Sequence, residues 1–310
     1  MLKLQVVIVA YNKVELVIKA IDSINDSLFL HKKHITVIDN SDDFAASLHL
    51  KNRLKNMKNI DYFKNNQNLG FAKAVNQGLK LSIKRKYDYI LLLNDDAFVD
   101  NKCIFYLIKA LNKDKKALLA GPTIFYAKYP DKIWSAGGYI NRILGNLHMP
   151  LKNKIAKNCT LSLMDPQYVD FLTGCVLMLK REAIEKVGFF DENLFFYAED
   201  LEYCLRAKKM GYKLMYVPYA LAWHDINVNK NRTNPFVLYN LARNNIIARK
   251  KHFNKSLFAR YLLSHFYLYT PYRIYQVLKG SRNVNSIKAW VQGSIDGILA
   301  TKEFSFKKNI

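Results

Sequence analysis

Apolar runs alternate with helical patterns through the first hundred residues, and this alternation predicts an α/β fold with a mostly parallel sheet. Residues 4–10 form a nearly continuous apolar run rich in β-branched side chains, typical of a strand buried on both faces. Apolar residues then recur at helical spacing between Val14 and Leu28, and residues 35–38 form a second buried run. This strand–helix–strand unit should close right-handed.

The polar residues that end these strands are expected at one edge of the sheet, because ligands of such sheets bind outside the carboxyl ends of the strands. Ala10 and Tyr11 end the first strand, and Asp39 and Asn40 end the second. Asp39 is placed to hold a ribose or a base edge, although Asp-Asn-Ser is also ordinary turn chemistry. No GxGxxG follows the first strand, so an ordinary dinucleotide fingerprint is absent.

Two further polar segments are predicted between residues 62 and 96. An Asn-rich turn at residues 65–68 leads through Gly70 into a helix with one apolar face, and such a turn can approach phosphate or ribose closely. Residues 89–93 then form a buried strand that ends in Asn94-Asp95-Asp96. Two carboxylates leaving a buried strand are costly unless they are paired or solvated. The sequence therefore favours a divalent cation, Mg²⁺ or Mn²⁺, over a simple strand-ending turn.

A second pair of acids begins a helix. The aromatic run 195–197 precedes Glu199 and Asp200, and an apolar pattern at helical spacing continues to Gly211. Both acids fall in the first turn, where the backbone N–H groups and the helix dipole favour an ionised carboxylate. An ionised acid beside an aromatic wall suits a general base. The simpler interpretation is a capping acid on an amphipathic helix.

Seven segments in this order resemble a family 2 glycosyltransferase of the GT-A fold, in the branch that includes rhamnosyl- and related bacterial sugar transferases. They are residues 7–12, 37–41, 65–76, 92–96, 171–175, 187–192 and the Glu199-Asp200 segment with Arg206 and Gly211. The expected catalytic domain is residues 1–225, with a Rossmann-like nucleotide-binding sheet covered by helices on both faces. The resemblance implies inverting transfer from a nucleotide-diphosphate sugar to a saccharide or lipid-linked saccharide.

The resemblance also implies roles for individual acids. Asp39 is similar to the family's nucleotide-binding acid, and Asp96 is similar to the last acid of its DxD motif, which binds the metal. Asn94 stands where many members have the first acid of that motif. Asp200 resembles the catalytic base, and Glu199 is the competing candidate.

Further candidates follow from the same segments. His224 matches a histidine that some GT-A enzymes use on the metal or diphosphate, although a lone histidine after an apolar run is more often a packed core residue. Gly174 and Trp134 are expected near the sugars, and residues 134–138 resemble the rhamnosyltransferase-like branch, which favours dTDP-rhamnose over UDP-hexoses and UDP-galactofuranose. The residues expected to bind the nucleotide sugar are Ala10, Tyr11, Asn12, Asp39, Asn40, Asn68, Gly70, Phe71, Asn76, Asn94 and Asp95.

Positive charge is concentrated late in a chain whose net charge is +23. Residues 226–310 hold 15 Lys and Arg against Asp296 and Glu303, and a helical region is expected from residue 234 onward. Residues 257–278 are rich in aromatics, but their longest charge-free stretch is too short to span a membrane. Such a segment suits an anionic membrane surface, and the alternative is a helical subdomain with a solvated basic face.

Composition narrows the class of protein. Half of the residues are hydrophobic, which excludes a disordered chain. The cysteines (Cys103, Cys159, Cys175 and Cys204) lack metal or redox spacing and are expected as buried thiols. Without a predicted signal peptide, we expect a cytoplasmic enzyme, peripheral on the inner face of the membrane. A homo-oligomer is compatible with the sequence.

Parts of the sequence are also compatible with other functions. Nucleic acid is excluded as a partner because no helix-turn-helix, zinc or RNP-like motif is present. A sugar nucleotidyltransferase is the nearest alternative enzyme, but it would need a glycine-rich basic loop after the first strand. A catalytically silent nucleotide-sugar-binding protein is the third alternative, and the presence of both Asp96 and Asp200 argues against it.

Overall fold

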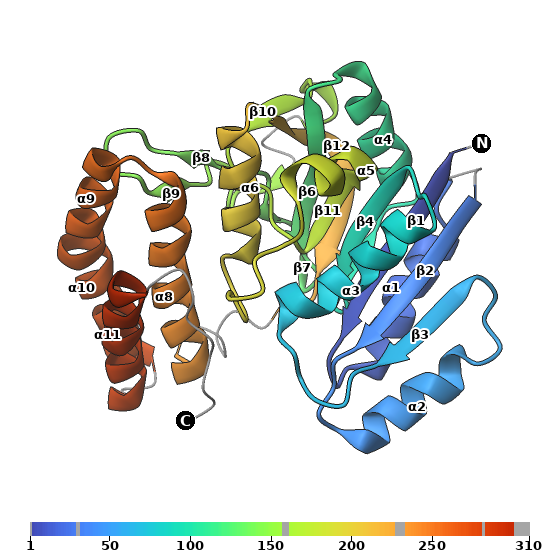
Figure 1. Ribbon diagram of the computed structural model, residues 1–310, viewed down its shortest axis with the longest axis horizontal. Coiled ribbons are helices and arrows are strands. Elements are labelled where there is room, and N and C mark those ends of the chain that lie inside the picture. The colour runs from blue at the N-terminus through green and yellow to red at the C-terminus, as the bar shows by residue number, and fades with distance from the viewer. Residues whose placement is uncertain (1, 29–31, 157–160, 227–232, 281–282, 301–310) are drawn as a thin grey trace.

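A ten-stranded mixed sheet forms the centre of the molecule in the computed structural model, which describes residues 2–28, 32–156, 161–226, 233–280 and 283–300 (Figure 1). The strand order is β10-β12-β6-β11-β4-β1-β2-β3, with β5 paired to β12 and β7 to β6. The strands are β1 (Lys3–Ala10), β2 (Lys32–Asp39), β3 (Ile60–Lys64), β4 (Tyr89–Asn94), β5 (Ala97–Val99), β6 (Ala117–Tyr126), β7 (Tyr129–Ser135), β10 (Gln167–Val169), β11 (Val176–Lys180) and β12 (Lys213–His224). A separate hairpin pairs β8 (Tyr139–Ile140) with β9 (Leu147–His148).

The predicted parallel core of this sheet is confirmed. β4, β1, β2 and β3 are parallel neighbours, and β6 is parallel to β12, whereas β11 runs antiparallel between β4 and β6. Within β1, Val6 and Ile8 belong to the hydrophobic core on one face, and Val7 and Val9 belong to the core on the other. The continuous apolar run at residues 4–10 therefore reflects burial on both faces.

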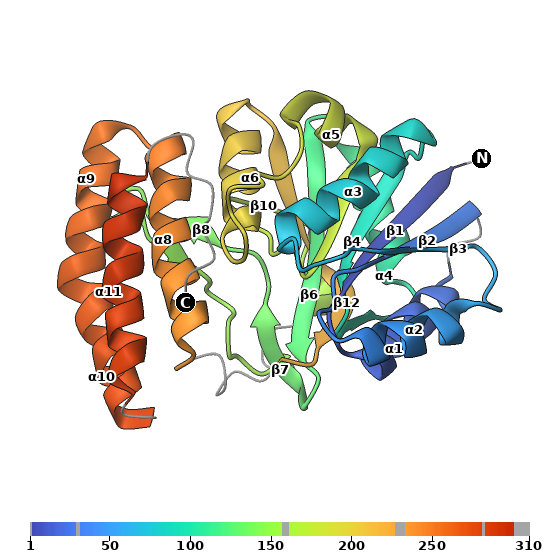
Figure 2. The same ribbon diagram turned by 60° about the horizontal axis from the view of Figure 1, so that its bottom comes forward.

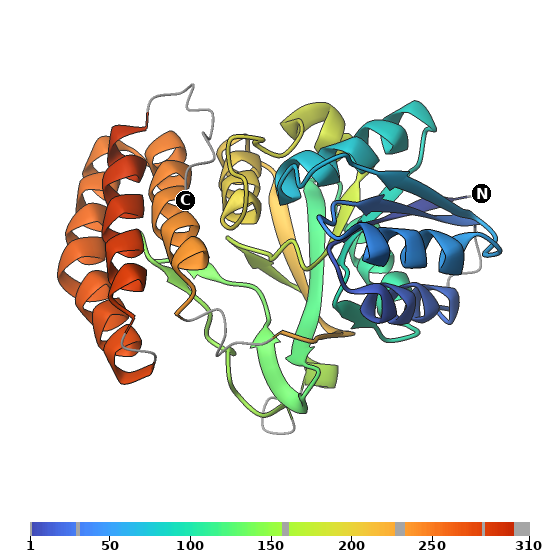
Figure 3. The ribbon, with the colours of Figure 1, turned by 90° about the horizontal axis from the view of Figure 1, so that it is seen from below.

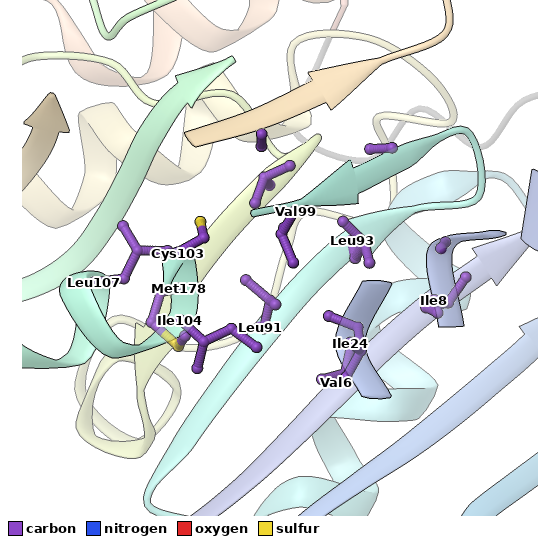
Figure 4. Close-up of a cluster of buried hydrophobic side chains, with 14 of the residues drawn as sticks. Val6, Ile8, Ile24, Leu91, Leu93, Val99, Cys103, Ile104, Leu107 and Met178 are labelled. Carbon is purple, nitrogen blue, oxygen red and sulfur yellow. The ribbon is translucent and has the colours of Figure 1, made fainter. Parts of the chain in front are cut away.

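Helices cover both faces of the sheet, as predicted. The helices of the sheet region are α1 (Val14–Asn25), α2 (Phe44–Leu54), α3 (Phe71–Lys84), α4 (Cys103–Lys113), α5 (Arg181–Val187) and α6 (Glu199–Lys209). Buried side chains of α1, α2 and α4 pack in one core cluster, and those of α3, α5 and α6 pack in the other. Figure 4 shows the first cluster, where Ile24, Ile104 and Leu107 meet side chains of β1, β4 and β11. A short 3-10 turn, Leu161–Leu163, precedes β10.

Among the described residues, four helices after the sheet form a separate layer beside α6 (Figures 1 and 2). They are α8 (Pro235–His252), α9 (Lys255–Ser264), α10 (Thr270–Gly280) and α11 (Val284–Leu299), with a π-helical turn at His265–Tyr269 between α9 and α10. Asn234 caps α8 by accepting from the backbone of Phe236 and Val237, so the predicted helix start is confirmed. No helix in the described ranges combines the length and the apolarity that crossing a bilayer needs.

α11 lies unusually close to α8 because two of its glycines face the α8 backbone. A Cβ added at Gly293 would lie 2.3 Å from the carbonyl oxygen of Tyr239, and one added at Gly297 would lie 2.7 Å from that of Arg243. Figure 3 shows α8 between α6 and the outer helices, so this contact joins the outer helices to the rest of the fold.

Candidate active site

The carboxyl ends of β1, β2 and β4 meet at one edge of the sheet. Ala10 is in register with Asp39, and Val9 is in register with Asn94. Just beyond β1, the backbone N–H of Tyr11 donates to Asp95 Oδ2 at 2.8 Å, and the Tyr11 hydroxyl donates to Asp42 Oδ2 at 3.0 Å. The residues predicted at three strand ends therefore share this edge.

An amide network forms one wall of the edge. Asn40 Nδ2 donates to Asn68 Oδ1 at 2.8 Å, and Asn40 Oδ1 accepts from the backbone of Leu69 at 3.0 Å. Asn68 Oδ1 also accepts from the backbone of Gly70 at 2.9 Å, immediately before α3. Two side-chain amides thus fix the turn that leads to the N-terminus of α3, where backbone N–H groups suit an anion.

Three predicted nucleotide-binding residues have side chains engaged in the protein itself. Asp39 has no exposed surface, and its oxygens accept from the backbone of Ser41 and from the Tyr62 hydroxyl. The Asn76 side chain bonds to the backbone N–H and carbonyl of Phe190 and to Glu192. Asn12 Oδ1 accepts from the backbone of Asp43, and its own φ is 57°. Their roles in nucleotide binding stay predictions.

Asp96 lies between the side chains of Lys13 and His224. Lys13 Nζ is 2.6 Å from Asp96 Oδ2, and His224 Nε2 is 2.9 Å from Asp96 Oδ1. The Trp134 ring meets the His224 ring edge-on, with centroids 4.4 Å apart. Asp96, His224 and Trp134, predicted from distant parts of the sequence, are therefore neighbours, and Lys13 joins them.

The two adjacent acids at the end of β4 differ in charge. Burial and the neighbouring Asp96 raise the pKa of Asp95 to about 7. Burial also disfavours ionisation of Asp96, but the contacts with His224 and Lys13 outweigh it and lower its pKa to about 2. Asp96 is therefore the acid that carries full negative charge at neutral pH.

The side chains around Asp96 offer ligand atoms that suit a divalent cation. The side-chain oxygen of Asn94, two residues before Asp96, is buried without a hydrogen-bond partner in the described part of the chain. One carboxylate, one amide oxygen and one imidazole are acceptable ligands for Mn²⁺, which completes its shell from water or phosphate. Within the described residues, no group of three or more His, Cys, Asp or Glu side chains forms a complete metal site.

Asp200 and Glu199 occupy the first turn of α6, as predicted, but in different surroundings. Asp200 accepts from the backbone of Gly174 at 3.0 Å and from that of Leu201 at 2.7 Å, whereas Glu199 is 7% exposed and its Oε2 has no partner within the described ranges. Burial and the charge of Asp200 raise the pKa of Glu199 to about 8. Burial also raises the pKa of Asp200, but its hydrogen bonds favour the ionised form.

A short segment joins the two acid pairs. The backbone of Gly174 binds Asp200, and the carbonyl of the next residue, Cys175, accepts from the backbone of Asn94 at 2.9 Å. Burial and the charges of Asp96 and Asp200 raise the pKa of the Cys175 thiol. The predicted metal-binding acid and the predicted base thus face one region of the molecule.

Sequence reasoning missed several residues of this region. Lys13 follows the first strand like any surface lysine, and only the fold brings it to Asp96. Asn244 of α8 donates to the carbonyls of Phe196 and Tyr197, just before the acid pair of α6. A polar residue in a helix 48 positions away gives no signal in a single sequence.

This mixed sheet, with a charged acid at the end of β4 and an acid pair at the start of a helix, has the architecture of the GT-A fold. A sequence model of Glycosyl transferase family 2 matches residues 5–188, more than half of the chain, so the protein belongs to that family. The match ends before Glu199 and Asp200, and the roles of those two residues are proposals.

Known proteins agree with this class. Poly-beta-1,6-N-acetyl-D-glucosamine synthase of Staphylococcus aureus (strain COL) is 25% identical over 215 residues, which are 69% of this chain and 47% of that protein. The protein of the same name from Staphylococcus epidermidis is 23% identical over the same shares of both chains. The chain therefore spans about half the length of the curated relatives it matches.

Two solved structures have the same fold. GalNAc-T7 with UDP, GalNAc and Mn²⁺ aligns with a TM-score of 0.63 and 17% identity, over 96% of this chain and 57% of that chain. The mannosyltransferase PcManGT from Pyrobaculum calidifontis, in complex with GDP-Man and Mn²⁺, aligns with a TM-score of 0.59 and 13% identity, over 95% and 86%. The predicted GT-A fold is confirmed, and the rhamnosyltransferase-like branch stays a prediction.

Proposed function

We propose that this protein is an inverting, metal-dependent glycosyltransferase that moves a sugar from a nucleotide-diphosphate sugar to a saccharide or lipid-linked saccharide. The observation that carries the proposal is the Gly174-Cys175 segment, which contacts Asp200 on one side and the end of β4 on the other. This segment supports one shared site. In that site one acid would bind the metal at the leaving diphosphate, and the other would deprotonate the acceptor.

Asp200 is proposed as the general base. An acceptor hydroxyl that attacks the anomeric carbon must lose its proton to a group within about 2.6–3.2 Å. Asp200 is half-buried, and although burial raises its pKa, two backbone N–H groups stabilise its anionic form. Glu199 is buried, and its raised pKa keeps it mostly protonated at neutral pH, so it is a poor acceptor for that proton.

Asp96, His224 and Asn94 would hold the divalent cation near the diphosphate. When bound, such a cation stabilises the negative charge that develops on the leaving group. Lys13 adds a positive charge beside Asp96 and can contact the same phosphates. A single base with electrostatic stabilisation of the leaving group is sufficient for inversion.

Two observations bear on the donor. Trp134 packs against His224 and belongs to the segment that resembles rhamnosyltransferases, which supports dTDP-rhamnose. The names of the relatives and neighbours support UDP-N-acetylhexosamines and GDP-mannose instead. Cell-surface polysaccharide synthesis fits either donor class.

A donor screen tests the proposal. The full chain is incubated with dTDP-rhamnose, UDP-N-acetylglucosamine, UDP-galactofuranose or GDP-mannose, each with Mn²⁺ or Mg²⁺, and thermal stability and release of nucleoside diphosphate are measured. One donor should raise the melting temperature, since binding at a hundred times the dissociation constant adds about 2.7 kcal/mol. Failure of every donor to bind and to react would overturn the proposed function.

We also propose an anionic membrane surface as a partner of the outer helices. A set of large apolar and aromatic side chains is exposed along α9, the π turn and α10, and Tyr267 is 76% exposed. Exposed Arg260 and Lys279 lie at the two ends of this set, so its charge is complementary to anionic lipid. The exposed aromatic stripe consists of Leu263, Phe266, Tyr267, Leu268, Tyr269, Tyr272, Tyr275 and Leu278.

A further inference from the structure

The helix that carries Asp200 begins after two successive residues in the left-handed backbone region. Tyr197 has a φ of 68°, and Ala198 has a φ of 65° and a ψ of 6°. Each non-glycine residue held in this region costs about 1–3 kcal/mol and persists only where the surrounding structure enforces it. Ala198 also provides no side-chain cap for α6. The local sequence therefore does not stabilise this turn, and its support comes from elsewhere in the fold.

Asn244 of α8 supplies two hydrogen bonds to the turn. Its Nδ2 donates to the carbonyl oxygen of Phe196 at 2.9 Å and to that of Tyr197 at 3.1 Å. Asn244 has no exposed surface, so water cannot replace these bonds without cost. Because the two carbonyls flank the backbone of Tyr197, one amide fixes both peptide planes that lead into Ala198.

Arg243 holds the Asn244 amide in the required orientation. Its Nη1 donates to Asn244 Oδ1 at 2.7 Å and to the carbonyl oxygen of Asn193 at 3.4 Å. Since a guanidinium can only donate, the amide oxygen must face Arg243 and the NH₂ group must face the turn. Arg243 is 3% exposed, and a charge this deeply buried is tolerated only where hydrogen bonds compensate it.

The same loop is also fixed on its opposite side, at the start of α3. The backbone N–H of Phe71 donates to the carbonyl oxygen of Phe195 at 2.9 Å. A Cβ added at Gly70 would lie 2.5 Å from that oxygen, so only glycine permits this approach. Phe236 of α8 stacks on Phe196 with centroids 6.3 Å apart. The loop before Asp200 is thus held between α3 and α8.

We infer that Asn244 is a positioning residue for Asp200: it maintains the left-handed turn that aims the first turn of α6 at Gly174. The inference rests on the proposed function, in which Asp200 is the base. Without the Nδ2 donor, Tyr197 and Ala198 relax toward the right-handed region, and the Asp200 carboxylate moves from its place. The layer of helices after the sheet is then part of the catalytic apparatus, although the family match ends at residue 188.

Steady-state kinetics of the full chain test this inference, with nucleoside diphosphate release from the donor found in the screen as the readout. In Asn244→Ala, kcat should fall about 10- to 100-fold, because small displacements of a catalytic group have effects of this size. The donor KM should change little, since the strand-end residues are untouched. Asn245→Ala is the matched control and should leave kcat unchanged, because the side-chain hydrogen bonds of Asn245 in the described part of the chain, to the carbonyl of Leu241 and from Arg249 Nη1, stay within its own helix.

Two double variants separate positioning from general stability. Ala198→Gly removes the side-chain penalty of the left-handed conformation, so adding it to Asn244→Ala should recover part of the lost kcat. In the Asp200→Asn background, Asn244→Ala should cause no further loss of kcat, because a residue that acts through Asp200 has nothing left to position. A merely structural residue would give the same loss in both backgrounds.

The outcomes are distinguishable from a failure of the proposed function. Wild-type kcat in Asn244→Ala would overturn the inference and leave the proposed function standing. A further loss of kcat when Asn244→Ala is added to Asp200→Asn would do the same. Wild-type kcat in Asp200→Asn would overturn the assignment of the base. If Asn244→Ala does not fold, Asn244→Asp decides, because it keeps the oxygen that faces Arg243 and replaces the donor with a carboxylate oxygen that repels the two carbonyls. The same kcat loss is expected for it, and wild-type kcat would contradict the inference.

Discussion

Glu199 and Asp200 are adjacent in the chain, yet the fold gives their carboxyl groups different hydrogen-bond partners. Asp200 reaches two backbone N–H groups, whereas Glu199 points into a buried space with one oxygen unpartnered in the described part of the chain. The same contrast separates Asp95 from Asp96, since only Asp96 contacts Lys13 and His224. In each pair, one acid has partners that stabilise its anion, and the neighbouring acid has a pKa raised by burial and by the charge beside it.

Substitution of each acid of α6 should therefore have different effects on turnover. Asp200→Asn removes the proton acceptor and should lower kcat by about 10²–10⁴-fold, with donor binding nearly intact. Glu199→Gln keeps a neutral group and should retain most of the activity. Steady-state kinetics on both variants provide the measurement. Loss of activity in Glu199→Gln with normal activity in Asp200→Asn would move the role of base to Glu199.

Glu199 should also make stability depend on pH. Its pKa is about 8 in the folded protein, above the value of roughly 4.3 in an unfolded chain. Its contribution to stability is therefore fully present below about pH 4 and is lost as the pH rises toward 8. Glu199→Gln should raise the unfolding free energy at pH 8 by at least about 1 kcal/mol, the equivalent of one pKa unit. Thermal unfolding of both proteins from pH 4 to pH 9 should show the difference vanish at the acidic end.

The metal assignment predicts a requirement for Asp96 and for a divalent cation. EDTA should abolish transfer, and added Mn²⁺ or Mg²⁺ should restore it. Asp96→Ala should weaken binding of the nucleoside diphosphate in the presence of Mn²⁺, measured by calorimetry, because it removes the one fully charged acid of the pair. Asp95→Ala should weaken that binding less. Full transfer in EDTA would show that Lys13 and other basic groups balance the leaving-group charge without a metal.

At the scale of elements, the strands that carry the site were predictable because their burial leaves a simple pattern. The apolar runs at residues 4–10, 35–38 and 89–93 correspond to β1, β2 and β4. The helix predicted from Val14 to Leu28 ends earlier, at Asn25, and Leu28 is half-exposed beyond it. Its apolar side chain continued the helical spacing by coincidence.

Elements with weak patterns could not be predicted. α2 was missed because it lies against the sheet with only Ser47, Leu50 and Leu54 buried, so its sequence has little amphipathic contrast. The short strands β5 and β10 pair at the ends of β12 and depend on that long strand rather than on their own residues. Buried thiols were predicted correctly for Cys103, Cys175 and Cys204, whereas Cys159 lies outside the described residues.

The close contact of α11 with α8 predicts an unusual response to alanine. Gly→Ala in a helix interior normally stabilises by about 1 kcal/mol. At Gly293, however, the new Cβ would meet the Tyr239 carbonyl at 2.3 Å, and overpacking costs about 1–3 kcal/mol. Gly293→Ala should therefore lower the unfolding free energy in urea titrations. Lys288→Ala, at an exposed position of the same helix, serves as the control and should change it little; an equal or higher stability for Gly293→Ala would contradict the packing.

At the scale of the whole molecule, the exposed aromatic stripe predicts binding to anionic lipid. The protein should sediment with phosphatidylglycerol vesicles at low salt, less at high salt and poorly with phosphatidylcholine alone, since each Lys or Arg at the surface contributes about 1 kcal/mol within a Debye length. Replacing Tyr267 and Tyr272 by serine should weaken sedimentation. Tyr129→Ser, at a position on β7 as exposed as Tyr272, should not. If the unmodified protein does not sediment with anionic vesicles at low salt, the membrane proposal is wrong.

The hydrogen bonds between Asn244 and the turn at Tyr197 also have a consequence for when the protein becomes active during its synthesis. The amide donor lies 48 positions after the Phe196 carbonyl that it binds. The chain emerges from the ribosome with its N-terminus first, so the sheet and both acid pairs emerge before the helix that holds the turn. During that interval the nascent protein already has its nucleotide edge and its acids but has no support for the turn. Catalytic competence should therefore arise late in translation, when α8 docks, and a ribosome stalled after β12 would carry a chain with a folded sheet and little transferase activity.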